Sequence, residues 1–270
     1  MWLLRGILGG RIGFDRFITQ YITGSYIFES EKMVGGCMAV NRCSDTFVDE
    51  FVECGYTIER GMFSLENCDR LISVANELAK RRNEGWRPLM QPHREESIFW
   101  DALSEPLLTS RVSSLVDGAV DGLQSEFFFS PPGTRGFAKH QDNFFVEAPA
   151  GAFASAWIAL TDITQHNGGL VVWPGTNREG LLQVRKIAED GGPMQDPNSN
   201  NEETIVPPKY HSKDIIVAKG DVVFIDGWLV HASHINHAKA NRPVLLCTYI
   251  RKGCSFRAGR YAKREAIPLA

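Results

Sequence analysis

The order of apolar and polar positions predicts helices in the first part of the chain. Apolar residues recur with helical spacing from 45 to 54, from 64 to 82 and from 103 to 116, with polar and charged residues between them. A short run of strand-forming residues at 56–59 separates the first two helices. Gly55 can end the first helix, because glycine readily adopts the left-handed conformation that closes one.

From 123 onward the pattern becomes that of strands. Runs of apolar, aromatic and β-branched residues alternate with turn signals such as Asn167-Gly168-Gly169. Short strands separated by such turns indicate a mainly β fold with flanking helices, of the sandwich or barrel type. The clearest predicted strands are 123–130, 153–161 (small and large side chains in alternation), its return strand 170–173, 222–226 and 244–250.

Two segments depart from this alternation. We expect residues 1–44 to be an N-terminal extension, either disordered or an organelle-targeting segment, because it is apolar, arginine-bearing and poor in acids. We expect 45–270 to form a single domain. Within it, 176–213 is long, polar and rich in Pro, Gly and Asn, which predicts either a lid-like insertion over a site or a mobile surface loop.

The composition narrows the class of partner. With 270 residues, 43% hydrophobic and 23% charged, the chain has the make-up of a globular protein. A net charge of -3 gives no reason to expect a nucleic acid or an anionic membrane as partner. Arg and Gly interrupt the N-terminal apolar run before it reaches the length of a membrane span. The six cysteines show no C-x-x-C spacing, so we expect free thiols and a cytoplasmic protein.

His140 and Asp142 form the first candidate site. In an extended strand residues i and i+2 point the same way, so an imidazole and a carboxylate would project from one face. One such pair, completed by a distant second histidine, is the facial triad that holds non-haem Fe(II) with positions left open. The alternative is a solvated strand end with two polar residues.

Three histidines, His231, His234 and His237, lie close together further along the chain. A surface cluster is one interpretation. Position favours His231 as the third ligand, because it follows the apolar strand 222–226 after a short link and is preceded by Leu229 and Val230. The other two stand among polar and small residues, and we expect them to be exposed.

Arg242 follows His231 by eleven residues and leads into the apolar strand 244–250. Burying a guanidinium is costly unless an anion pairs with it, and a carboxylate fits its two-pronged geometry. Arg242 is therefore a candidate anchor for a carboxylate ligand.

Together these motifs resemble the phytanoyl-CoA dioxygenase family of Fe(II)- and 2-oxoglutarate-dependent oxygenases. The chain contains H-x-D, then N-G-G-L-x-V-x-P-G, then H-x-S-x-x-N-x(5)-R, in that order. The resemblance extends from about 45 to 250 and is strongest from Gln124 onward. It implies a double-stranded β-helix, a distorted jelly roll, over about 123–250 within one oxygenase domain.

The resemblance also implies roles for residues. It places the catalytic metal on His140, Asp142 and His231, and cosubstrate contacts on Arg242, Ser233, Gln124 and Ser155. Arg242 matches the residue that binds the distal carboxylate of 2-oxoglutarate, and Ser233 matches the serine beside it. The implied reaction uses Fe(II), 2-oxoglutarate and O2 to hydroxylate an unactivated C–H bond of a small molecule, releasing succinate and CO2.

Several residues qualify this interpretation. Thr176-Asn177 follows the Pro-Gly turn where the family usually has Ser-His, and Phe128 stands where some relatives carry Asn. Candidates for a dry wall around the metal, or else simply core, are the aromatic residues Phe137, Phe144, Phe145 and Trp157. The alternative functions are a cupin-like metal-binding module, or a metal-dependent isomerase or hydrolase without 2-oxoglutarate turnover.

The C-terminal stretch 251–264 carries six basic residues. It is either a solvated basic tail or a holder for an anionic group of the substrate, such as a phosphate.

Overall fold

The structure is a computed structural model, and it describes residues 46–187 and 202–269. Its helices are α1 (Phe47–Cys54), α2 (Leu65–Arg82), α3 (Ser97–Leu103), α4 (Pro106–Leu115) and α5 (Asn143–Val146), with 3-10 turns η1 (Pro92–Arg94) and η2 (Thr176–Glu179). Its strands are β1 (Tyr56–Glu59), β2 (Leu89–Met90), β3 (Val120–Phe128), β4 (Phe153–Ala159), β5 (Leu170–Val172), β6 (Val184–Lys186), β7 (Glu202–Thr204), β8 (Lys213–Asp214), β9 (Val222–Asp226), β10 (His231–Ser233), β11 (Val244–Arg251) and β12 (Ile267–Pro268). The expected extension 1–44 lies outside the described residues.

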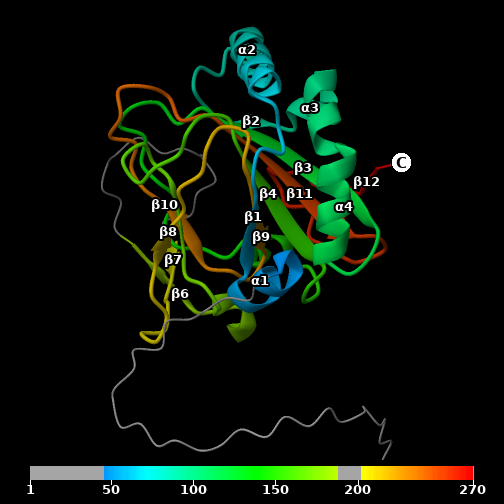
Figure 1. The fold of residues 1–270 in the computed structure, drawn as a ribbon, viewed down its shortest axis with the longest axis vertical. Coiled ribbons are helices and arrows are strands. Elements are labelled where there is room, and N and C mark those ends of the chain that lie inside the picture. Colours follow the sequence, from blue (N-terminus) through cyan, green and yellow to red (C-terminus); the bar gives the residue numbers. More distant parts are fainter. Residues whose placement is uncertain (1–45, 188–201, 270) are drawn as a thin grey trace, which may run out of the picture. The chain divides into compact units, whose positions relative to one another are not determined.

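Two antiparallel sheets build the core of the described fold. The larger has the strand order β1-β9-β4-β11-β3-β12, with β2 also paired to β3, and the smaller has the order β10-β5-β8. Helices α3 and α4 lie along the β3 side of the larger sheet, and β8 and β10 lie away from these helices (Figure 1). This arrangement confirms the expected mainly β fold with flanking helices and a double-stranded β-helix core.

Strand β4 separates two hydrophobic cores. Its residues Ala154, Ala156 and Ile158 belong to the core shared with α2, α3 and α4. Trp157 and Ala159 belong to a second core that also contains residues of β5 and β9. All seven residues of the strand are buried, as the alternating small and large side chains predict. One face of β4 therefore borders the space between the two sheets.

Two predicted elements differ from the structure. The predicted helix 103–116 begins as the end of α3, and α4 starts anew at Pro106. Proline has no backbone N–H to donate, so it suits the first turn of a new helix rather than a helix interior. The strand predicted at 170–173 does not return beside β4 but pairs with β10 and β8.

The described ends of the segment 176–213 flank the region of His140. Strands β6 and β7 pair as an antiparallel hairpin. The backbone N–H of Thr204 donates to the carbonyl of Lys139 at 2.7 Å, next to His140. The middle of this segment, 188–201, lies outside the described residues, so the lid remains a prediction.

Two further expectations concern membrane-spanning helices and the state of the cysteines. Within 46–187 and 202–269, the structure has no helix with the length and apolarity needed to traverse a bilayer. Cys68, Cys247 and Cys254 are free thiols, as expected. The expectation is wrong at Cys54, which is disulfide-bonded.

Gly136 lies where the segment before His140 runs close to β10. A Cβ at this position would lie 1.8 Å from the carbonyl oxygen of Ser233, which no real contact tolerates. We therefore expect Gly136→Ala to lower the free energy of unfolding by about 2–4 kcal/mol, measured by chemical denaturation. Gly133→Ala is the control: its Cβ would meet open space, and its φ of +79° alone should cost about 1 kcal/mol. Equal losses for both variants would contradict the close contact.

Candidate active site

Two histidines meet across an isolated antiparallel bridge. The backbone N–H of His140 donates to the carbonyl of His231 at 2.9 Å, and the reverse hydrogen bond is 3.0 Å. His231 begins β10, which β5 holds in the smaller sheet. The centroids of the two imidazole rings are 4.2 Å apart. Backbone pairing thus brings together two residues that are far apart in the sequence.

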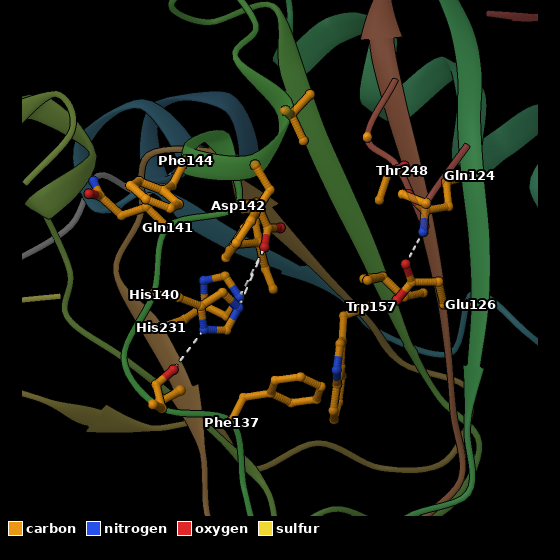
Figure 2. Close-up of a pocket in the computed structure, with 18 of the residues that line it drawn as sticks. Gln124, Glu126, Phe137, His140, Gln141, Asp142, Phe144, Trp157, His231 and Thr248 are labelled. Carbon is orange, nitrogen blue, oxygen red and sulfur yellow. Dashed lines mark hydrogen bonds and ion pairs between the residues drawn. The ribbon is translucent and has the colours of Figure 1, made fainter. Parts of the chain in front are cut away.

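Asp142 joins the two histidines, but not from an extended strand. Its φ of -57° and ψ of -36° are helical, and it immediately precedes α5. The expectation that strand alternation aligns His140 with Asp142 is therefore wrong. Oδ1 of Asp142 nevertheless lies 3.6 Å from Nε2 of His140 and 3.6 Å from Nε2 of His231. The three ligand atoms lie within 4.8 Å of one another, and Figure 2 shows both rings and the carboxylate directed at one space.

Hydrogen bonds to backbone carbonyls orient both imidazoles. Nδ1 of His140 lies 2.8 Å from the carbonyl oxygen of Ala138, and Nδ1 of His231 lies 3.1 Å from that of Leu229. A carbonyl oxygen only accepts, so each Nδ1 carries a proton, and each Nε2 is the nitrogen that a neutral ring has free for a metal. These are the atoms that face Asp142, so both rings are set to bind a cation.

The charges of the cluster follow from burial and contact. Burial lowers the pKa of His140 to about 4, so this imidazole is neutral near pH 7. Burial alone would raise the pKa of Asp142, but the positive charge of His231 and His140 when protonated, and a hydrogen bond from Ser155, hold it below its ordinary value. The hydroxyl of Ser155 donates to Oδ2 of Asp142 at 2.7 Å, which leaves Oδ1 on the side of the histidines. One anionic oxygen and imidazole nitrogens form a donor set for a divalent transition metal.

Arg242 is a buried guanidinium without an acidic partner among the described residues. Arg242 is only 3% exposed, and its Nε has no hydrogen-bond partner among the described residues. The guanidinium carbon lies 5.7 Å from the centre of the Trp157 ring. Burial lowers the pKa of Arg242 to about 10, so it is still positively charged near pH 7. A buried cation that lines the pocket and lacks a counter-charge is suited to bind an anion.

The other predicted cosubstrate residues divide into two groups. Ser233 and Gln124 line the same pocket as Arg242. The oxygen of Ser233 accepts a hydrogen bond from the backbone N–H of Phe137 at 2.8 Å, and the amide of Gln124 donates to Glu126. Ser155 instead contacts Asp142 and is not among the pocket-lining residues of the described part of the chain.

A cavity of about 660 Å³ surrounds the cluster. This volume lies in the range of small-molecule sites and exceeds what a five-carbon diacid occupies. The four aromatic residues predicted as a dry wall, Phe137, Phe144, Phe145 and Trp157, all line it. Figure 2 shows Phe137, Phe144 and Trp157 around the cluster. Phe128 lines it too and packs edge-on against Phe137, with ring centroids 5.7 Å apart.

Gln141 stands between two cluster residues and has a supporting role that the sequence does not reveal. It is only 2% exposed, and its amide serves three backbone groups. Its nitrogen donates to the carbonyls of Gly180 at 2.8 Å and Trp228 at 2.6 Å, and its oxygen accepts from Leu182 at 2.8 Å. Gln141 thereby ties the segment that carries His140 and Asp142 to the chain before His231. A residue between two candidate ligands gives no sequence signal for such contacts.

Thr248 is also missed. Its hydroxyl lines the pocket and has no hydrogen-bond partner among the described residues. The available signal is a hydroxyl within the apolar strand β11.

His234 and His237 do not join the cluster. Nε2 of His234 lies 2.7 Å from Oδ1 of Asp214, and His237 is exposed. Among the described residues, the group that could hold a metal ion is His140, Asp142 and His231.

Comparisons with known proteins agree with this geometry. The phytanoyl-CoA dioxygenase (PhyH) family model matches residues 51–244. A phytanoyl-CoA dioxygenase of Arabidopsis thaliana is 29% identical over 181 residues, which are 65% of this chain and 61% of that protein. The peroxisomal phytanoyl-CoA dioxygenase of Rattus norvegicus is 30% identical over 129 residues, 47% of this chain and 37% of that protein. The chain spans less than two thirds of the length of each of these relatives.

Solved structures share the fold. The non-heme alpha ketoglutarate dependent carbocyclase SnoK from nogalamycin biosynthesis superposes with a TM-score of 0.66 at 20% identity, covering 84% of this chain and 91% of SnoK. EctD from S. alaskensis, solved with 2-oxoglutarate and 5-hydroxyectoine, gives a TM-score of 0.59 at 18% identity, covering 80% of this chain and 79% of EctD. At these identities the likeness concerns the fold.

Proposed function

The chain belongs to the phytanoyl-CoA dioxygenase family, and from that premise we propose that it is an Fe(II)- and 2-oxoglutarate-dependent dioxygenase. The proposed reaction hydroxylates an unactivated C–H bond of a small molecule with O2 and releases succinate and CO2. The observation that carries this proposal is the presence, in one pocket, of the three-residue cluster and the unpaired cation Arg242.

The cluster fits Fe(II). His140, Asp142 and His231 would supply two imidazole nitrogens and one carboxylate oxygen, the facial triad that leaves positions for other ligands. The second nitrogen of each imidazole and the second oxygen of the carboxylate are already hydrogen-bonded, as the outer contacts of metal ligands usually are. When bound, iron would supply the activation of O2 coupled to decarboxylation of 2-oxoglutarate.

The chain would hold 2-oxoglutarate through the negative charge of its distal carboxylate. Arg242 offers unpaired donors to the distal carboxylate of 2-oxoglutarate. Ser233, Thr248 and Gln124 line the same pocket, and their hydroxyls and amide can add hydrogen bonds. Trp157, over which the guanidinium lies, would keep this end of the pocket dry.

The remaining space would bind the substrate and exclude water. Phe137, Phe144 and Phe145 would provide an apolar wall beside the cluster. The names of the relatives make phytanoyl-CoA the first compound to test.

As further proposals, 45–270 is one oxygenase domain, 176–213 acts as a lid, and the protein works in the cytoplasm. The rat relative is named as peroxisomal, so imaging of the tagged full chain should decide the location.

The test is 2-oxoglutarate turnover by the full chain reconstituted with Fe(II) without oxygen and then exposed to O2. We expect succinate formation to require both Fe(II) and 2-oxoglutarate, and one substrate in a small-molecule library to gain one oxygen atom. Product mass must be measured, because SnoK is named a carbocyclase rather than a hydroxylase. Product formed without 2-oxoglutarate would favour a metal-dependent isomerase or hydrolase, and metal binding without any turnover would favour a binding module.

Ser155→Ala should weaken metal binding without unfolding the protein. The variant frees Oδ2 of Asp142 from its hydrogen bond, so the carboxylate can turn away from the histidines. Loss of such an outer contact typically costs about 10- to 100-fold in metal affinity or activity. Ser125→Ala is the matched control, since this equally buried hydroxyl on β3 contacts His93 instead. Titration with Fe(II) under nitrogen measures both, and equal affinities would contradict the role of Ser155.

A further inference from the structure

The C-terminal chain supplies part of the pocket wall. After β11 it returns to the cavity that contains the cluster. The residues that line this cavity from the C-terminal chain are Arg257, Gly259, Arg260, Tyr261, Ala262 and Arg264. Three of the six basic residues in the stretch 251–264 therefore border the cavity.

This wall is held from two sides. The guanidinium of Arg257 donates to the carbonyls of Phe144 and Phe145 in α5, at 3.0 Å each. On the other side, the amide nitrogen of Gln91 donates to the carbonyl of Ala262 at 2.8 Å. Because α5 directly follows Asp142, the wall is attached to the same segment as the cluster. It is built in place and not a loosely attached tail.

Arg264 is a half-buried cation in this wall that lacks a counter-charge. Its Nη1 donates to the carbonyls of Phe145 and Arg257, at 3.3 Å each. Among the described residues no carboxylate lies within 4.0 Å of its nitrogens, although Glu126 and Asp142 exert some attraction. Burial lowers the pKa of Arg264. A half-buried guanidinium fixed by carbonyls, with donors left over, is suited to bind an anion.

The neighbouring cations differ from Arg264. Arg257 is paired with Glu147 at 2.8 Å, and Lys139 is paired with Glu203 at 3.1 Å. Arg260 is exposed and lies over the ring of Tyr261. Arg257 and Lys139 thus already have acidic partners, although Lys139 shares Glu203 with Arg185, whereas Arg260 can add charge at the outer side of the wall.

We propose that Arg264, assisted by Arg260, binds a carboxylate or phosphate group of the substrate, so that the substrate is an anion with an apolar part. The anionic group would lie against the C-terminal wall, while the apolar part would extend along the aromatic side of the cavity. Arg242 would be left to the cosubstrate. This inference deepens the proposed function and rests on it, because it takes the cavity to hold both molecules.

The test measures binding without turnover. Full-length protein loaded with Fe(II) and saturating 2-oxoglutarate under nitrogen is titrated by calorimetry with octyl phosphate, octanoate and octanol. We expect at least one anionic probe to bind about 10- to 100-fold more tightly than octanol, as for a hydrogen bond to a charged group. Whichever anion binds more tightly identifies phosphate or carboxylate as the group recognised.

Variants separate Arg264 from a general effect of charge. Arg264→Gln should reduce the preference for the anionic probe to less than about threefold, with the Kd values of octanol and 2-oxoglutarate unchanged, whereas Arg264→Lys should keep part of it. Lys252→Gln is the matched control, because it removes one positive charge from the same stretch at an exposed position outside the cavity wall. Equal binding of all three probes by the wild type, a preference that survives in Arg264→Gln, or weaker 2-oxoglutarate binding in that variant would each overturn the inference. Failure of the wild type to bind 2-oxoglutarate would instead count against the proposed function.

Discussion

His231→Ala is expected to abolish Fe(II) binding and turnover, and His234→Ala to leave both close to wild type. His231 presents Nε2 at 3.6 Å from Asp142, while His234 directs its Nε2 to Asp214 at 2.7 Å. Removing a direct ligand should cost more than the roughly 10- to 100-fold that outer contacts cost, so activity should fall by well over 100-fold. The two histidines are three positions apart in the sequence, which makes them a matched pair.

The measurement is metal content after equilibration with Fe(II) under nitrogen, followed by 2-oxoglutarate-dependent succinate formation. His140→Ala should behave like His231→Ala, because its Nε2 is equally close to Asp142. Circular dichroism of each variant checks that the fold survives. Retained iron in His231→Ala, or lost iron in His234→Ala, would show that the distal ligand is assigned to the wrong histidine.

The fold follows from sequence where local pattern decides the outcome. The helices α1 and α2 begin and end near residues that cap them, Ser64 and Gly55 among others. Strand β4 is buried on both faces, as its alternation predicts. Pairing between strands is different, because β5 bonds to strands that come much later in the chain. Non-local pairing of this kind has no signature in a short stretch of sequence.

The candidate site, like the fold, follows from the sequence only in part. Residue types and spacing are enough to nominate the three cluster residues and Arg242. The structural reason given for the first pair is wrong, since Asp142 has a helical backbone and reaches the histidines from the start of α5. Contacts that depend on how loops pack, such as those of Gln141 and Arg264, become visible only in three dimensions.

Arg242→Gln is expected to raise the KM for 2-oxoglutarate by about 100-fold, with a much smaller effect on substrate binding. The buried guanidinium has no acidic partner among the described residues, so the proposed partner is the distal carboxylate. Removing one member of a buried, hydrogen-bonded charge pair costs on the order of 3 kcal/mol, which corresponds to about 100-fold. Glutamine keeps much of the length and some hydrogen bonding, but it lacks the positive charge and cannot donate the two parallel hydrogen bonds of a guanidinium to a carboxylate.

A stability measurement separates this role from a structural one. In the protein without cosubstrate, Arg242 is desolvated, which lowers its pKa to about 10, and its main compensation is the ring of Trp157. Arg242→Gln should therefore unfold within about 1 kcal/mol of the wild type when 2-oxoglutarate is absent. In the wild type, saturating 2-oxoglutarate should raise the Tm through binding to the folded state, and the variant should lose most of this increase.

Arg251→Gln is the control, since Arg251 lies at the far end of β11 and donates to the carbonyl of Val116 at 3.1 Å, outside the cavity wall. An unchanged KM together with a lowered Tm in Arg242→Gln would mean that Arg242 supports the fold and that another residue binds the carboxylate.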